Sequence, residues 1–164
     1  MALAAITLQP ADIVAVRRPS FRPGVSVNLE QGLTDELGAF LRAGLDDGSR
    51  EADEFTDIDD SVAVGLSLKG QSWSRADDTI GLAVETAGVS RAAQAFLAAG
   101  GLGVLVGDGR LLRYARENVV EAYYSAALIK GVTLTADYQF VANPAYNAER
   151  GPISVLGLRL HGQF

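Results

Sequence analysis

The ionisable residues of this sequence do not have the types or spacing of a catalytic or metal-binding set. Histidine occurs once, at His161, and cysteine is absent. A zinc site or a Ser-His-Asp triad needs several such groups brought together, so we expect no enzyme and no cofactor. Carboxylates are densest in Asp46–Asp60, but their spacing is not that of a calcium-binding EF-hand loop. We interpret this run as a solvent-exposed loop, with weak divalent-cation binding as the alternative.

The composition argues against two classes of protein. The formal net charge is −6, whereas binding to a phosphate backbone requires a basic surface, so we expect no nucleic-acid partner. No stretch approaches the roughly 18 consecutive apolar residues of a membrane-spanning helix. The segment Met1–Val16 has no basic start and does not resemble a secretory signal, so we expect no export signal in it.

Apolar and polar residues alternate in seven segments, which predicts β-strands with one apolar and one polar face. In Gly131–Val141, for example, Leu134 and Ala136 lie on one face, while Thr135 and Asp137 lie on the other. The same alternation is found in Val25–Glu30, Phe40–Leu45, Ser61–Lys69, Thr79–Glu85, Glu117–Leu128 and Ile153–Phe164.

The connections between these segments alternate in length. The long ones are Asp47–Asp60, Thr86–Arg116 and Ala142–Pro152, and the short ones are Gly32–Glu36, Gly70–Asp77 and Ile129–Gly131. In an up-and-down meander all long connections lie at one end, as in transmembrane barrels. Within the longest one, Ser90–Ala99 predicts a short helix capped by Ser90. A soluble acidic β-sandwich that binds a partner without catalysis remains the alternative, and independence of detergent would distinguish it.

Several segments follow one another in the order and spacing of one family. They are Asn28–Gln31 with Phe40–Arg42, Phe55–Asp60, Gly65–Asp78, Phe96–Gly109, Glu117–Tyr124 and Asp137–Phe164. The most specific are ENVVEAYY, the DYQ…NP segment and the GLRL…F ending. Together they resemble the carbohydrate-selective porins of the OprB family, over residues 24–164. Residues 1–23 show no such resemblance and are left unassigned.

The resemblance implies an all-β, antiparallel up-and-down transmembrane barrel. This chain would supply about seven C-terminal strands of about sixteen, so it is expected to be a truncated product or part of a larger assembly. The implied function is passive, carbohydrate-selective diffusion of sugars across the bacterial outer membrane. The implied partners are sugars as permeants, outer-membrane lipid, the barrel-insertion machinery, and either a homo-oligomer or a missing N-terminal half.

The polar faces of the predicted strands would line the sugar pathway. Charged groups of both signs there would order water and disfavour apolar solutes. A tyrosine ring would stack on a sugar while its hydroxyl donates a hydrogen bond. The expected lumen residues are Glu30, Arg42, Lys69, Glu85, Glu121, Tyr123, Asp137, Gln139, Arg159 and His161. The expected membrane-insertion signal in the last strand is Leu156, Leu158, Leu160 and Phe164.

Overall fold

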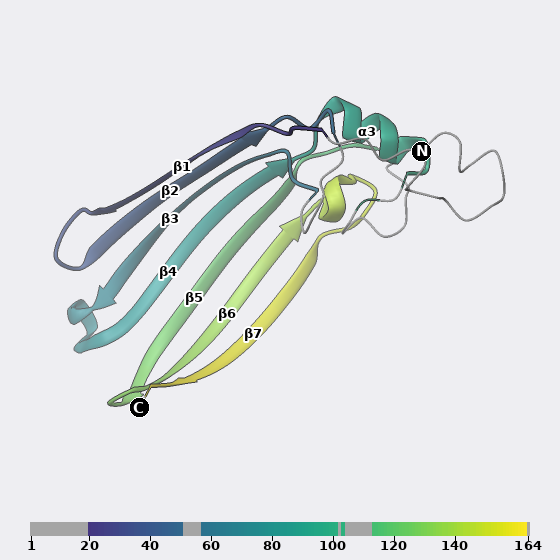
Figure 1. The fold of residues 1–164 in the computed structure, drawn as a ribbon. Coiled ribbons are helices and arrows are strands. Elements are labelled where there is room, and N and C mark those ends of the chain that lie inside the picture. The colour runs from purple at the N-terminus through teal and green to yellow at the C-terminus, as the bar shows by residue number, and fades with distance from the viewer. Residues whose placement is uncertain (1–19, 51–56, 102, 104–112, 164) are drawn as a thin grey trace.

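The strands of the chain form one antiparallel sheet in the order of the sequence. The computed structural model describes residues 20–50, 57–101, 103 and 113–163. Within this part the strands are β1 (Gly24–Gly32), β2 (Leu37–Asp46), β3 (Asp60–Gly70), β4 (Arg75–Gly88), β5 (Glu117–Ile129), β6 (Val132–Ala142) and β7 (Ile153–Gly162). Each strand pairs with the next, and the curved sheet is open, with β1 and β7 at its edges (Figure 1).

The strand register places the apolar residues of neighbouring strands directly opposite one another. Side chains of directly paired residues lie on the same face, and successive residues along a strand alternate between faces. One row across the sheet consists of Leu29, Leu41, Val64, Val84, Val120 and Phe140. The predicted alternation therefore produces a continuous apolar face, whose side chains are largely exposed in this structure.

The connections have the predicted arrangement. The short helix α3 (Arg91–Ala98) and the 3-10 turn η2 (Pro144–Tyr146) lie at one end of the sheet, and η1 (Gln71–Trp73) lies at the other (Figure 1). The predicted cap is confirmed, since Ser90 Oγ accepts a hydrogen bond from the Ala93 backbone N–H at 3.1 Å. No helix in the described part of the chain is long and apolar enough to cross a membrane.

Strand β4 is longer than predicted, because it begins at Arg75 and ends at Gly88 rather than spanning 79–85. The turn before it occupies only residues 71–74, where Ser74 adopts a left-handed conformation with φ of 62°. At the same end of the sheet, β5 and β6 are joined through Lys130 and Gly131. Gly131 has φ of 78°, a conformation that glycine adopts without steric cost.

The buried apolar residues of the described chain gather at the end that carries α3. Ala87, Val89, Leu97 and Tyr146 form this cluster, and the strands between the two ends contribute little to it. A sandwich would instead bury one face of the sheet against a second sheet. The sandwich alternative is therefore not supported, because the strands of the described residues all belong to a single sheet.

Candidate functional site

The candidate site is the face of the sheet opposite the apolar one. All ten predicted lumen residues lie on it. Each stands directly opposite a residue of this face in a neighbouring strand, and directly paired residues share a face. One row on this face is displaced by one residue along each strand from the apolar row described above. It consists of Glu30, Phe40, Gly65, Ala83, Glu121 and Gln139. The following row of this face consists of Gly32, Gly38, Ser67, Gly81, Tyr123, Asp137 and Gly157. The two rows cross β4 to β7 near the middle of each strand, and the second row reaches the short-turn end of β1 and β2 at Gly32 and Gly38.

The remaining predicted residues lie on the same face, farther toward the strand ends. Toward the end that carries α3, Arg42 pairs with Asn28 and Glu85 pairs with Val119. Toward the short turns, the pairs are Lys69 with Thr79, Thr135 with Arg159, and Thr133 with His161.

The charged side chains of the polar face interact mostly with one another and with solvent. Arg42 Nη2 lies 3.4 Å from Glu30 Oε1, and its Nε donates to Asn28 Oδ1 at 3.3 Å. Gln139 Nε2 donates to Glu121 Oε2 at 3.2 Å, across the β5–β6 pair. The exposed contacts of Arg42 contribute little to stability, so these groups are available to exchange hydrogen bonds with solutes.

The polar face does not bring together a metal centre. Among the described residues, no cluster of three or more histidine, aspartate or glutamate side chains has the arrangement of a metal site. His161 stands on β7 opposite Thr133, near the short-turn edge. What the face offers is a surface of hydrogen-bonding groups with two aromatic rings.

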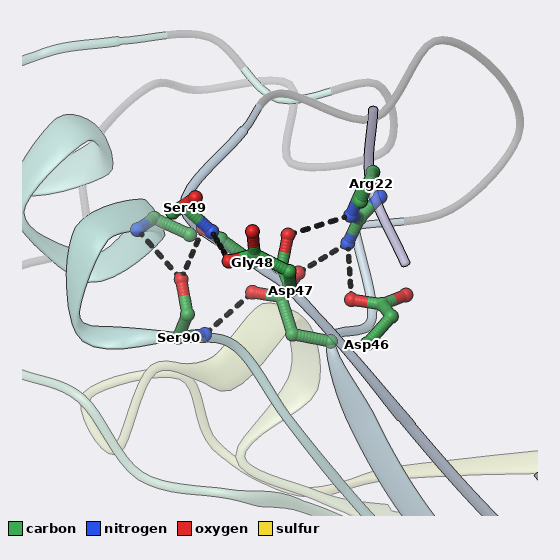
Figure 2. Close-up of polar contacts among 8 residues, drawn as sticks. Arg22, Asp46, Asp47, Gly48, Ser49 and Ser90 are labelled. Carbon is green, nitrogen blue, oxygen red and sulfur yellow. Dashed lines mark hydrogen bonds and ion pairs between the residues drawn. The ribbon is translucent and has the colours of Figure 1, made fainter. Parts of the chain in front are cut away.

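A network of arginine and aspartate side chains closes the α3 end of the sheet. Arg22 bonds to Asp46 at 2.7 Å and to the backbone oxygen of Asp47 at 3.2 Å, and it also forms an ion pair with Asp59 (Figure 2). The Ser90 backbone N–H donates to Asp59. Arg22 thus links the start of β1 to the two ends of the acidic run.

This network shows that the acidic run is not solvent-exposed throughout, although Asp47, Ser49 and Arg50 within it are exposed as interpreted. Asp59 is only 6% exposed, because Arg22 and the start of α3 enclose its carboxylate. At the exposed Asp47, the side chain and backbone N–H of Ser49 donate to the carboxylate and lower its pKa. Residues 51–56 of the run lie outside the described part of the chain.

A second arginine, Arg116, makes a similar connection between β3, β4 and β5. It forms an ion pair with Asp60, and its Nε donates to Thr86 Oγ1 at 3.0 Å. Neither Arg22 nor Arg116 was among the residues predicted from the sequence. Each stands just before a strand that starts at the α3 end, and this shared position is the signal that could have identified them.

Similarity to known protein families identifies the family of this chain. The model for carbohydrate-selective porins of the OprB family matches residues 2–164. This chain belongs to the OprB family. No curated protein matches the sequence.

A solved structure, the high-pH form of OprB from Pseudomonas putida, shares the fold of this OprB-family chain. The two superpose with a TM-score of 0.62 at 23% sequence identity. The match covers 78% of this chain but 30% of the Pseudomonas putida chain. This chain therefore spans less than a third of the length of the porin that it matches, which agrees with its open sheet.

Three of the four residues predicted as an insertion signal lie on β7 in this OprB-family sheet. Leu156, Leu158 and Leu160 belong to the apolar face and are highly exposed at the sheet edge. Phe164 lies outside the described residues.

At the short-turn end, Trp73 Nε1 donates to the Tyr124 hydroxyl at 3.3 Å, and Tyr124 donates to the buried carboxylate of Asp78.

Proposed function

We propose that this chain forms part of the wall of an outer-membrane porin through which sugars diffuse passively. The observation that supports this proposal best is the register, which separates a continuous apolar face from a continuous polar one. A barrel wall needs both faces, since one contacts lipid and the other contacts water. Membership of a carbohydrate-selective porin family supports sugars as the permeants.

The mechanism requires no chemical step. Sugar hydroxyls would exchange hydrogen bonds between water and the ten polar-face residues, from Glu30 on β1 to His161 on β7. Charges of both signs, such as Arg42 and Glu121, would hold ordered water and make passage unfavourable for apolar solutes. Residues 24–164 supply the wall in this proposal.

The proposed partners follow from the two faces and the edges. Outer-membrane lipid would cover the apolar face, and the insertion machinery would read the apolar residues of β7 with Phe164. The unpaired edges of β1 and β7 would pair with further strands, either from a longer chain or from an assembly. An edge strand left open exposes unpaired backbone groups, which have no partner inside a membrane.

Sugar uptake by liposomes tests the proposed function. The native assembly that contains this chain, extracted from outer membranes in detergent and reconstituted, should admit glucose faster than triglycine, a solute of similar mass. Empty liposomes and liposomes with residues 1–164 alone serve as controls, and neither should swell. Equal rates for the two solutes would overturn carbohydrate selectivity, and absence of glucose entry would overturn the pore itself.

The positions of the loops predict which residues face the cell exterior. Long loops of outer-membrane barrels are extracellular and short turns are periplasmic. Ser49 and Glu149 are exposed in the long connections, so Ser49→Cys or Glu149→Cys in the native assembly should react with a membrane-impermeant maleimide on whole cells. Lys130→Cys should react only after lysis. The chain has no native cysteine to interfere. Labelling of Lys130→Cys on intact cells, with Glu149→Cys protected, would invert the proposed topology.

A further inference from the structure

Two aromatic rings lie against the sheet on its polar face. The Phe40 ring covers Gly65, and the Tyr123 ring covers Gly81, so a Cβ at either glycine would overlap the ring. Each ring lies over the strand next to its own, because Phe40 pairs directly with Gly65 and Tyr123 pairs directly with Gly81. The rings therefore approach one another from β2 and β5 across β3 and β4.

A hollow lies between the two rings. Its lining includes Glu30, Gly38, Phe40, Ser67, Ala83 and Tyr123. The floor is made by small residues of β3 and β4, which leave room above the backbone that larger side chains would fill. Both rings are partly exposed, so part of their surface is accessible from the open side of the sheet.

Glu30 lines this hollow, and further charged residues stand beside it in the strand register. Glu30 stands in the same row as Phe40, and Glu121 stands in that row on β5. Asp137 pairs with Tyr123. The Arg42 guanidinium lies 5.0 Å from the centre of the Phe40 ring and also contacts Glu30 and Asn28.

We propose that Phe40 and Tyr123 form a subsite for one pyranose ring, with Glu30 and Glu121 accepting hydrogen bonds from its hydroxyls. This inference rests on the proposed sugar-conducting function and names where on the wall a sugar pauses. A pyranose has apolar C–H faces and a polar edge. It matches a hollow with aromatic rings at its sides and carboxylates at its rim, which is the usual composition of a small-molecule site.

Block of ion current by sugar tests the subsite. In the native assembly reconstituted in planar bilayers, Phe40→Leu and Tyr123→Leu should each raise the half-blocking glucose concentration roughly three- to tenfold. Tyr123→Phe keeps the ring and should stay within about twofold of the unmodified protein. Phe140→Leu makes the same replacement on the apolar face, and it should leave the half-blocking concentration unchanged.

A measurement on the unmodified protein avoids any defect in folding. Glucose should block the current at a lower concentration than sorbitol, an open-chain polyol of similar size that lacks a ring face. Equal blocking concentrations for glucose and sorbitol, or unchanged block in both leucine variants, would overturn the subsite while leaving glucose entry into liposomes intact. Absence of glucose entry would instead overturn the proposed function on which the subsite rests.

Discussion

Leu158→Arg is expected to prevent stable insertion of the sheet into the outer membrane. Leu158 lies on the apolar face in the middle of β7, opposite Ala136, and its side chain is 75% exposed in this structure. In the proposed barrel it contacts lipid, where an arginine near the bilayer midplane is unfavourable by about 2–4 kcal/mol. The heat-modifiable electrophoretic mobility of the native assembly, which distinguishes folded from unfolded barrels, measures the effect.

Gly157→Arg is the matched control, because it places the same side chain one residue earlier on the opposite face. Gly157 pairs with Asp137, whose carboxylate lies in ordinary contact distance of an added Cβ. The new guanidinium would face water beside that carboxylate, so the barrel should still fold. Equal loss of folded protein from Leu158→Arg and Gly157→Arg would show that the two faces do not differ in environment.

Asp59→Ala is expected to loosen the α3 end of the sheet. The substitution removes the ion pair with Arg22 and the acceptor for the Ser90 backbone N–H. Arg22 would keep Asp46 and the Asp47 backbone oxygen as partners, but the Ser90 N–H would lose its acceptor, which is unfavourable by about 1–3 kcal/mol. Backbone amides of α3 should then exchange hydrogen faster by a factor of about 5 or more.

Glu30→Ala provides the contrast, since it removes an ion pair of the other kind. Both Glu30 and Arg42 are more than 60% exposed in their contact, at 66% and 62%. Such a pair contributes about 0–1 kcal/mol, so exchange in the neighbouring strands should hardly change. If Asp59→Ala leaves the exchange of α3 as slow as Glu30→Ala does, the buried network does not hold this end together.

Much of the fold could be predicted because the alternation of apolar and polar residues determines most of its strands. Alternation along 132–142 or 117–129 defines both the strand and its two faces, and a slip of one residue would exchange those faces. The ends of β4 were harder, because Ala76–Asp78 and Thr86–Gly88 do not continue the apolar alternation. Thr86–Gly88 are strand because they pair with Asp60–Val62 of β3, and Asp78 is accommodated by Arg75 and Tyr124.

The site was predicted in part for the same reason. Polar residues on alternating positions share a face whatever their partners, so the register brought all ten together. Phe40 was not among them, because an aromatic residue on a polar face carries no periodic signal. Its place depends on Gly65, which lies 25 positions later in the chain and leaves space for the ring. Contacts between distant segments, including Arg22 with Asp59, are likewise invisible to a local pattern.

The odd number of strands in this sheet restricts what can close it. In the described chain β1 and β7 run in the same direction, because each of the seven strands reverses the one before it. A second copy with its long loops on the same side of the membrane would therefore present a parallel neighbour at both seams. Bacterial barrels of this kind have an even number of antiparallel strands. For the seven strands of the described residues, a complement whose two outer strands both run opposite to β1 and β7 meets this rule, whereas a like-oriented copy of the same seven strands does not.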